Sequence, residues 1–429
     1  MSAGPAERRA LLLALYGQAV AAAHPGLCLP AHLPDPPRAG RLILLAAGKA
    51  AGSMTEVAAT HYRAQGASRI AGLAVTRHGY GAQAAGLEIV EAGHPVPDEA
   101  GLQATGRTLD LARTAGPDDL VLVLLSGGGS ANWIAPAGRL TLAEKQGLTR
   151  ALLRSGADIG EINTLRKHLS RIKGGRLAAA CAPARLLTLA ISDVPRDDPS
   201  VIASGPTVPD PSTLADALDV VRRRGIDLPP EAARLLADPS SESPKPGDAV
   251  FAGAEYRIVA RPADMIAAVA REVAAAGYEA VVLGADLEGE AHEVAARHAA
   301  DALALKAAGR RVALVSGGEL TVTIRGRGGR GGPNQEYALA LAIALNGAAG
   351  ISALAADTDG IDGGDGAASD PAGAVVDETT LARARAAGLD PAGALSAHDS
   401  TSFFDKIGDL LVPGPTRTNV NDCRIILVD

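Results

Sequence analysis

VLVLLSGGGS, residues 121–130, joins an apolar run to three successive glycines between two serines. Such a run predicts a buried strand, and a glycine turn directly after it lets backbone N–H groups approach an anion closely. The pattern recurs at residues 312–319, where VALV leads into SGGE. Two phosphate-sized binding loops are therefore predicted. Their residues are Ser126, Gly127, Gly128, Gly129 and Ser130 in the first, and Gly317, Gly318 and Glu319 in the second.

Length and composition favour an α/β protein of two or three domains. The chain has 429 residues, too many for one ordinary core, and its three Phe and one Trp predict aliphatic cores. A net charge of -7 argues against a nucleic-acid-binding protein or one that binds anionic membranes. The three cysteines, Cys28, Cys181 and Cys423, are too far apart to suggest a disulfide framework or a zinc site, which indicates a reduced, cytoplasmic protein.

The N-terminal apolar stretch resembles a short signal peptide, but Tyr16 and Gln18 interrupt it, and we interpret it as the first amphipathic helix of a domain. No membrane span is expected. Strands are predicted at 42–46, 70–76, 87–91, 120–125, 186–191, 280–283, 311–315, 320–324 and 351–355. Helices between them include 141–155, 262–275, 288–308 and 334–345. This alternation predicts mostly parallel βαβ units. The proline-rich stretch 228–248 reads as a linker between domains 5–240 and 248–429.

Lys49 is the first candidate catalytic residue. It follows a predicted strand and a glycine at the start of a helix, where a cation opposes the helix dipole and calls for an anionic partner. The alternative is a solvated lysine. The segment is not a Walker A loop, because Ile43 and Ala50 stand where that motif needs a glycine and a Ser or Thr.

Residues 163–176 form the densest cationic stretch of the chain. Arg166 and Lys173 are expected to clamp a carboxylate or phosphate, although a solvated helix face and an RNA-binding patch are alternatives. His94, in a proline-rich turn, either contacts substrate or caps the turn. Asp193 follows the predicted strand 186–191 and is our candidate general base, because a carboxylate there can accept a hydroxyl proton or bind a metal.

Residues 326–331 satisfy the GxGxxG dinucleotide pattern, and Arg325, Arg327 and Arg330 around them also suit nucleotide phosphates. Asn334 opens the next predicted helix and is a candidate polar ligand. The loop 357–366 places Asp359, Asp365 and two further carboxylates among glycines. Either this loop lies near magnesium and nucleotide, or its carboxylates are solvated turn residues.

Nine segments in order resemble one family. They are LLAAGKAAGSM, EAGHPVPDEAG, LLSGGGSANW, RKHLSRIKGGRLA, ISDVPRDDPSVIASGPTVPD, VSGGELTVT, GGPNQEYAL, DTDGIDG and PGPTRTNVND. Together they look like the class II glycerate 2-kinases, also called the MOFRL family, which have long been confused with hydroxypyruvate reductases. The resemblance runs from about Lys49 to Asp422.

The resemblance implies ATP-dependent phosphorylation of D-glycerate at its 2-hydroxyl, giving 2-phosphoglycerate, with Mg²⁺. It implies a Rossmann-like, three-layer N-terminal α/β domain and a smaller C-terminal α/β domain, with the active site in the cleft between them. Lys49 falls on the family's active-site lysine, Ser126–Ser130 on its first glycine loop, Arg166 and Lys173 on its cationic clamp, and Asp193 on its acidic position.

In the C-terminal half, the resemblance implies that the loops at Gly317, Asp359 and Asn419 close the cleft. These residues are our candidates for nucleotide binding, and Asp193 and Asp359 are the metal-ligand candidates. One departure is visible, because Gly331-Gly332-Pro333-Asn334 stands where many members read Gly-Gly-Arg-Asn. Arg330 is the candidate replacement for that arginine. The competing hypotheses are an NAD(P)H-dependent hydroxypyruvate reductase, which rests on the GxGxxG run, and a non-catalytic nucleic-acid-binding module, which the acidic charge disfavours. A homodimer is left open.

Overall fold

The computed structural model describes residues 4–324, 326, 328–364 and 366–429. The chain forms two compact units. The first unit is Pro25–Val259, and the second unit combines the chain up to His24 with Ala260–Asp429. This division differs from the expected ranges 5–240 and 248–429, because the N-terminal helix packs in the second unit and the chain as far as residue 259 belongs to the first. Arg325, Arg327 and Asp365 lie outside the described residues.

The first unit is built on a six-stranded sheet of order β3-β2-β1-β4-β5-β6. The pairs β3–β2, β2–β1, β1–β4 and β4–β5 are parallel, as expected. The strands are β1 Leu42–Ala47, β2 Ile70–Arg77, β3 Glu88–Ala92, β4 Leu120–Leu125, β5 Arg185–Ile191 and β6 Ala254–Ala260. The helices are α2 Pro25–Cys28, α3 Ala51–Ala64, α4 Glu99–Arg113, α5 Gly129–Asn132, α6 Leu142–Arg154, α7 Ile159–His168, α8 Arg176–Cys181, α9 Leu214–Arg224 and α10 Pro230–Ala237.

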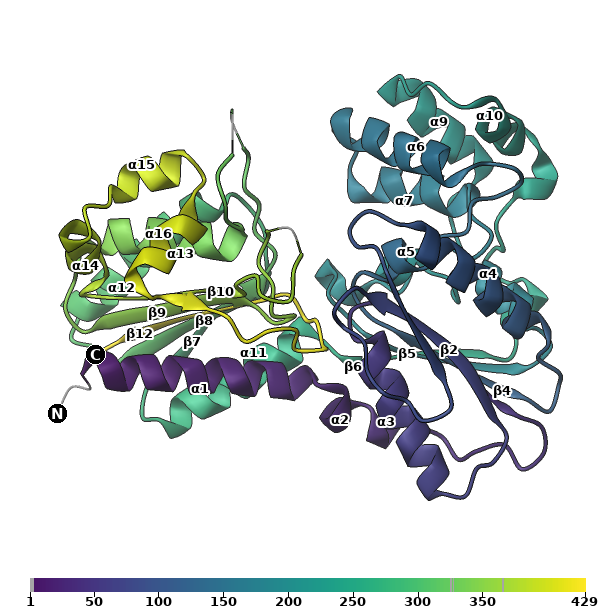
Figure 1. Ribbon diagram of the computed structural model, residues 1–429, viewed down its shortest axis with the longest axis horizontal. Coiled ribbons are helices and arrows are strands. Elements are labelled where there is room, and N and C mark those ends of the chain that lie inside the picture. Colours follow the sequence, from purple (N-terminus) through teal and green to yellow (C-terminus); the bar gives the residue numbers. More distant parts are fainter. Residues whose placement is uncertain (1–3, 325, 327, 365) are drawn as a thin grey trace. The chain divides into compact units, whose positions relative to one another are not determined.

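Helices cover both faces of this sheet, which gives the three-layer arrangement expected of a Rossmann-like domain. Strands β1 and β4 are buried at every residue, and alternate side chains pack against α4 and α8 on one face. Helix α3 contacts the same two strands, and Figure 1 shows α3 and α4 on opposite faces of the sheet. Such two-sided burial explains why both strands read as continuous apolar runs.

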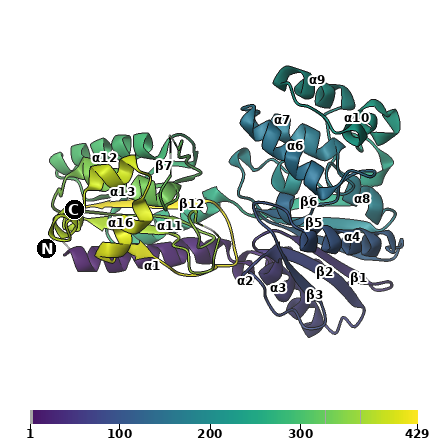
Figure 2. The ribbon, with the colours of Figure 1, turned by 45° about the horizontal axis from the view of Figure 1, so that its top comes forward.

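The stretch 228–248 is not a linker. It contains α10, whose Ala232, Leu235 and Leu236 are buried in a separate core with residues of α6, α7 and α9. Figure 2 shows these four helices gathered in one bundle. Pro230 occupies the first turn of α10, where its missing N–H breaks no helical hydrogen bond, so the proline that reads as a breaker starts a helix.

The second unit contains a mixed sheet of order β11-β10-β9-β12-β8-β7. Its strands are β7 Glu279–Leu287, β8 Val312–Gly318, β9 Ile351–Asp357, β10 Gly373–Asp377, β11 Leu410–Leu411 and β12 Asp422–Val428. The pair β7–β8 is parallel, but β12 lies antiparallel between β8 and β9, and β10 is antiparallel to β9. The expectation of mostly parallel pairing is therefore wrong for this half. Residues 320–324 contribute only a bridge from Thr321 to Glu290 and are not the expected strand.

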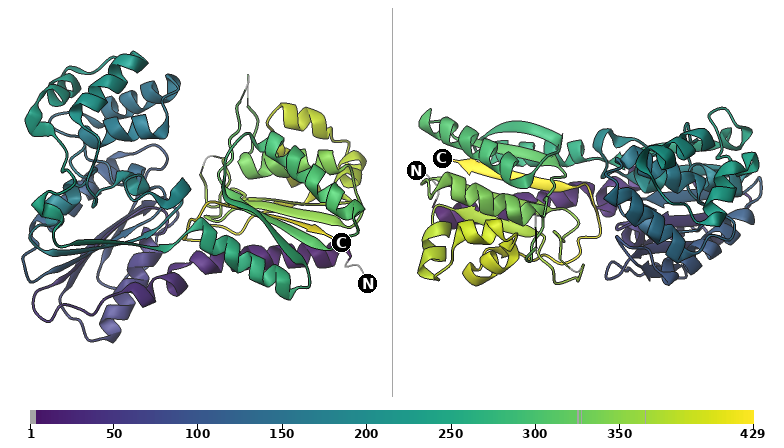
Figure 3. Two further views of the ribbon diagram at one scale, coloured as in Figure 1. Left: turned by 180° about the vertical axis from the view of Figure 1, so that it is seen from behind. Right: turned by 90° about the horizontal axis from the view of Figure 1, so that it is seen from above.

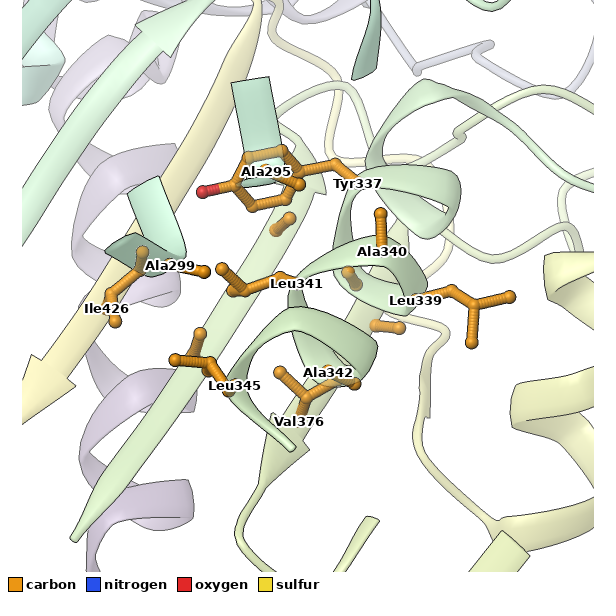
Figure 4. Close-up of a cluster of buried hydrophobic side chains, with 14 of the residues drawn as sticks. Ala295, Ala299, Tyr337, Leu339, Ala340, Leu341, Ala342, Leu345, Val376 and Ile426 are labelled. Atoms are coloured by element: carbon orange, nitrogen blue, oxygen red, sulfur yellow. The ribbon is translucent and has the colours of Figure 1, made fainter. Parts of the chain in front are cut away.

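Helices also cover both faces of the second sheet. They are α1 Pro5–Ala23, α11 Pro262–Ala275, α12 Ala291–Ala307, α13 Pro333–Leu345, α14 Thr380–Ala386, α15 Pro391–Ser396 and α16 Ser400–Ile407. Helices α1 and α11 lie together on one face, and α12 and α13 lie on the other (Figures 1 and 3). Figure 4 shows Tyr337, Leu341 and Leu345 of α13 beside Ala295 and Ala299 of α12. Small alanines facing larger side chains let the two helices approach closely.

The N-terminal apolar stretch is α1, and it is tied into the second unit. Arg8 is buried, donates to Ser352 Oγ at 2.9 Å and forms ion pairs with Glu378 and Asp429. Among the described helices, none alone combines the length and apolarity needed to cross a bilayer, and only the bent pair 5–23 and 25–32 meets that test jointly.

Candidate active site

The candidate residues of the first unit follow the strands of its sheet. Lys49 follows β1, His94 follows β3, the glycine turn follows β4 and Asp193 follows β5. Because parallel strands end at the same edge, these loops lie along one edge of the sheet, where ligands of α/β sheets bind.

The loops after β1 and β4 interlock through their backbones. Lys49 N donates to Gly127 O at 2.8 Å, and Ala50 N donates to Ser126 Oγ at 2.9 Å. Gly48 has φ 120°, and a side chain there would collide with Ser126. The Ser126 hydroxyl therefore joins the two loops, which places the Lys49 backbone directly against the glycine turn.

Gly128 brings Lys49 and His94 to the same point. It has φ 84°, and a Cβ built on it would lie 3.0 Å from His94 Cδ2 and 3.3 Å from Lys49 Cγ. A Cβ on Gly129 would lie 2.8 Å from Ala203 Cβ. Both glycines are thus required by close approach, and Gly128 also by its left-handed backbone.

His94 is a neutral imidazole in this environment. Burial, with the nearby charges of Lys49 and Arg77, lowers the pKa of His94 to about 3. Its Nδ1 is buried and has no hydrogen-bond partner among the described residues. The ring is therefore available to a ligand and does not cap the turn through that nitrogen.

A cavity of about 390 Å³ opens beside the glycine turn, and we call it the first cavity. It is lined by His94, Pro95, Val96, Pro97, Gly128, Ser130, Ala131, Ile134, Lys145, Gln146, Thr149, Arg150, Leu153, Arg166 and Lys173. Residues 94–97 form one wall, and Gln146 Nε2 fixes that wall by donating to Pro97 O at 2.8 Å. None of the described residues in this lining carries a carboxylate.

Two buried lysines hold the walls of the first cavity together. Lys173 Nζ donates to Ser130 O at 2.8 Å and to Trp133 O at 2.6 Å. Lys145 Nζ donates to Arg166 O at 3.1 Å and to Leu169 O at 2.8 Å. Burial, followed by the charge of Arg166, lowers the pKa of Lys173 to about 7, and burial also holds the pKa of Lys145 well below its usual range. Both shifts arise because the positive charges lack a negative partner.

Arg166 is a half-buried cation of the first cavity. Its guanidinium has no hydrogen-bond or ion-pair partner among the described residues, and burial lowers its pKa. By contrast, Lys167 pairs with Asp210 at 3.4 Å, and His168 Nε2 lies 2.9 Å from Glu242 Oε1. The structure therefore sorts the cationic stretch 163–176 into a cavity-facing pair, Arg166 and Lys173, and residues with structural partners.

Asp193 is half-buried and follows β5, next to β4 in the sheet. It contributes, with Asp198, to the raised pKa of the partly buried Tyr256, whose main cause is desolvation of the phenol. Asp193 is absent from the described lining of the first cavity. The loop after it has left-handed backbone at Ala203 and Ser204, and Ser204 Oγ lies 2.7 Å from Ser130 Oγ. Strained backbone of this kind concentrates at functional sites.

The glycines of the second predicted phosphate loop have a packing role. Gly317 and Gly318 lie within β8, and a side chain on Gly318 would collide with Leu287 of β7. Their carbonyls accept from Arg424 Nη1 at 2.7 Å and Nη2 at 3.1 Å. Glu319, directly after the strand, is exposed.

A buried polar network surrounds the start of α13. Asn334 N and Gln335 N donate to the two oxygens of Asp362, at 3.0 and 2.8 Å. Asn334 Nδ2 also donates to Asp422 Oδ1 at 2.7 Å, and Asp422 forms an ion pair with Arg424. Burial, with the charge of Asp422, raises the pKa of Asp362 to about 7. Asn334 is thus committed to two carboxylates through its donors, while its Oδ1 has no described partner.

The remaining candidates of the second unit lie around this network. Asp359 is buried and its Oδ1 accepts from Ile361 N at 2.8 Å, and Asn419 is buried with its Oδ1 accepting from Asn421 N at 3.1 Å. Arg330 is exposed and lines a cavity of about 270 Å³ with Asp362, Asp370 and other residues. Within the described ranges, no group of three or more metal-binding side chains is preassembled.

Three cations at this site, Arg77, Lys145 and the exposed Arg150, are absent from the candidates of the sequence analysis. Arg77 ends β2 and lies near His94, and its position at a strand end was a usable signal. Lys145 offers a weaker signal, because it shares the buried face of α6 with Leu148 and Leu152 and so occupies a position where an apolar residue is expected.

Comparison with known proteins agrees with this arrangement. Residues 11–237 match a domain family of unknown function, DUF4147, and residues 312–422 match the MOFRL family. A protein of Agrobacterium vitis that is provisionally named a hydroxypyruvate reductase is 49% identical, with 98% of this chain and 94% of that protein covered.

The D-glycerate 2-kinase of Thermotoga maritima is 41% identical, with 90% of this chain and 91% of that enzyme covered. The crystal structure of glycerate kinase from the same organism superposes with a TM-score of 0.87 at 38% identity, covering 99% of this chain and 100% of that one. The chain therefore belongs to the glycerate 2-kinase family of enzymes that carry the MOFRL domain.

Proposed function

We propose that this enzyme transfers the γ-phosphoryl group of ATP to the 2-hydroxyl of D-glycerate, giving 2-phosphoglycerate. The observation that carries the proposal is the first cavity, where the buried Lys145 and Lys173 and the half-buried Arg166 face no carboxylate among the described lining residues. Buried charges are normally paired, so such a cavity is built to receive an anion. Glycerate supplies a carboxylate next to the hydroxyl that would react.

In this proposal Arg166 binds the glycerate carboxylate, because a guanidinium fork matches its two oxygens. The neutral His94 and the backbone of the glycine turn, Ser126–Ser130, hold polar oxygens of the substrate or of the phosphoryl group. Lys173 acts mainly through the wall that it supports, since its ammonium is already bound to two carbonyls.

Lys49 and Asp193 carry the proposed chemistry. Asp193 accepts the proton of the 2-hydroxyl as its oxygen forms the new bond to the γ-phosphorus, while the bond from that phosphorus to the bridging oxygen breaks and ADP leaves. Lys49 stabilises the charge on the transferred group. In phosphoryl transfer, positioning and charge stabilisation supply most of the rate enhancement.

Magnesium is compatible with this proposal because it needs few ligands from the protein. Mg²⁺ is usually bound by one or two carboxylates together with water and phosphate oxygens, so no preassembled group of side chains is needed. It would neutralise charge on the phosphate oxygens. The candidate ligands that we propose are Asp193 and Asp359, and each is an at least half-buried carboxylate in a loop that follows a strand.

We assign nucleotide binding to the second unit as part of the same proposal. The residues are Gly317, Gly318, Glu319, Arg330, Asn334, Asp359 and Asn419. The support is the exposed Arg330 on a cavity beside the start of α13 and the Asn334 Oδ1 that has no described partner. D-glycerate and ATP are thus the proposed partners. Since all three cysteines are free, a reducing, cytoplasmic location is also proposed.

The alternative, an NAD(P)H-dependent hydroxypyruvate reductase, lacks the expected structural context. A dinucleotide fingerprint needs a strand directly before its glycines. Residues 320–324 form a single bridge and no strand, so the described chain does not lead from a strand into the glycines 326–331.

The test is an NMR assay of the purified protein with D-glycerate, ATP and Mg²⁺, run beside hydroxypyruvate with NADH or NADPH. We expect 2-phosphoglycerate and no oxidation of the cofactor. Formation of 3-phosphoglycerate would overturn the assignment of the hydroxyl, and cofactor oxidation without phosphoglycerate would overturn the kinase proposal. Two variants serve as controls. Arg166→Gln changes the proposed active site, and Arg107→Gln changes an arginine on the exposed side of α4.

A further inference from the structure

The first unit contains a second hollow that the proposed function does not use. It has a volume of about 520 Å³, and we call it the arginine cavity. Its lining includes Arg113 from α4, His168 at the end of α7, Ser170, Arg171, Arg176 and Glu242. Three guanidinium groups from separate positions of the chain therefore converge on one hollow.

The one carboxylate among these lining residues is already engaged. Glu242 Oε1 lies 2.9 Å from His168 Nε2 and 2.7 Å from Lys245 Nζ, and Oε2 accepts from Leu214 N at 3.0 Å. In the described chain no ion pair joins Glu242 to any of the three arginines. Glu231, which lies beside the lining residue Gly138, is held by Arg234 at 2.9 Å. The positive charge of the arginine cavity is thus not cancelled by its own walls.

Each arginine is positioned by the protein and keeps further N–H groups for a ligand. Arg176 Nη2 donates to Ser241 O at 2.6 Å, while its buried Nε has no described partner. Arg171 Nε donates to Pro136 O at 3.1 Å, and among the described residues Arg113 pairs with the exposed Asp110 alone. Burial lowers the pKa of Arg176, although Glu242 and Asp210 oppose the shift. A guanidinium that is anchored on one side loses less entropy when it binds on the other.

We propose that the arginine cavity is a second anion-binding site, distinct from the first cavity, and that it takes a phosphate group. Three guanidinium forks match the three oxygens and the double negative charge of a phosphate better than a single carboxylate. Ser170 Oγ already accepts from Ile172 N and Lys173 N, both at 3.2 Å, so its O–H is oriented to donate. The ligand is inorganic phosphate or a small phosphate monoester.

The two cavities share the segment 166–176. Arg166 and Lys173 face the first, whereas Ser170, Arg171 and Arg176 face the arginine cavity. Arg171 N donates to Ala135 O at 2.8 Å, which connects the segment to the chain that follows the glycine turn. A phosphate bound by Arg171 and Arg176 would restrain this segment, so its occupancy should alter substrate binding in the first cavity.

Hydrogen exchange of the full-length protein separates the two cavities. With inorganic phosphate or glycerol 3-phosphate as the probe, we expect slower exchange in peptides that cover 135–138 and 239–245. Slowing confined to peptides 94–98 and 145–153 would place the anion in the first cavity alone and overturn the proposal.

Calorimetric titration of the same two probes then tests the side chains. Arg171→Gln is expected to weaken phosphate binding at least tenfold, because it removes charge-assisted bonds. Arg171 is exposed, so this variant should fold, and Arg176→Gln is the second variant. Arg107 lies on α4 outside the arginine cavity, so the control variant Arg107→Gln should bind phosphate like the wild type. Equal affinity of the wild type, Arg171→Gln and Arg176→Gln would overturn the site, and the tighter of the two probes identifies the source of the phosphate group.

Discussion

The first cavity and the network at the start of α13 treat buried charge in opposite ways. In the first cavity, Lys145 and Lys173 are buried with backbone carbonyls as partners, and the half-buried Arg166 guanidinium has no partner among the described residues. At α13, Asp362 and Asp422 are equally buried, but donors or an arginine surround their oxygens. A charge that the protein leaves uncompensated indicates a ligand, whereas a charge that it satisfies internally indicates a structural role.

The largest expected effect is the loss of phosphoryl transfer in the first unit. Asp193→Asn should lower kcat for glycerate phosphorylation by about 10²–10⁴-fold, because the amide cannot accept the hydroxyl proton. The glycerate affinity should stay close to that of the wild type, as Asp193 is outside the described lining of the first cavity. Steady-state kinetics measures both values. Near-normal turnover would remove Asp193 from the role of base.

Next in size is the loss of the unpaired cation. Arg166→Gln should reduce kcat/KM for glycerate about 100-fold, since it removes charge-assisted hydrogen bonds worth about 3 kcal/mol. The protein should remain folded, because no described hydrogen bond of the guanidinium is lost. Arg107→Gln is the matched surface control. A variant that unfolds at lower denaturant concentration but retains full kcat/KM would show that Arg166 is structural.

Much of this comparison was visible in the sequence, and the missing part has a physical reason. Apolar runs that end in glycine predicted β1 and β4, and the loops after them supplied Lys49 and the glycine turn as separate candidates; only the fold shows that they lie together. Strand β12 was missed because Asp422 and Arg424 interrupt its apolar pattern, and only the fold shows that they neutralise each other. Lys145 was missed because a lysine on an apolar helix face looks accidental until its carbonyl partners are known.

A smaller effect is the uptake of a proton when glycerate binds in the first cavity. Lys173 has a pKa lowered to about 7 by burial and by Arg166, so a bound anion should restore its charge. Binding of glycerate should therefore take up a proton at pH 8 and little or none at pH 6, and the affinity should fall by at most about tenfold per pH unit above 7. Calorimetry in buffers of different ionisation enthalpy measures the uptake. Lys173→Arg keeps the charge at every pH and should abolish the effect, while equal heats in all buffers at pH 8 for the wild type would contradict it.

The smallest effect concerns the polar network at the start of α13. The variant Asp362→Asn tests whether the protein's own donors satisfy the buried carboxyl group. The folded pKa of Asp362 is raised to about 7, above that of the unfolded chain, so the native state binds more protons between about pH 4 and 7. Stability contributed by the protonated carboxyl is therefore present at low pH and is lost as the pH rises through 7. Asparagine loses one acceptor for the Gln335 donors, which should cost about 1–3 kcal/mol at pH 5, where the wild-type group is mostly neutral.

At pH 8 the wild type carries the cost of a buried charge and the variant does not, so the destabilisation by Asp362→Asn should be smaller there than at pH 5. Urea unfolding, with hydrogen exchange of the α13 amides as the probe, measures the free energy of unfolding at both pH values. Asp370→Asn, which removes a carboxylate from the same cavity wall, is the control and should destabilise equally at both values. A larger loss of unfolding free energy for Asp362→Asn at pH 8 than at pH 5 would contradict this prediction. It would mean that the wild-type carboxylate is ionised and fully stabilised by its four hydrogen-bond donors. The first cavity and the network at α13 would then differ only in the sign of their buried charge. In that case the first cavity alone would keep charge that a ligand must complete.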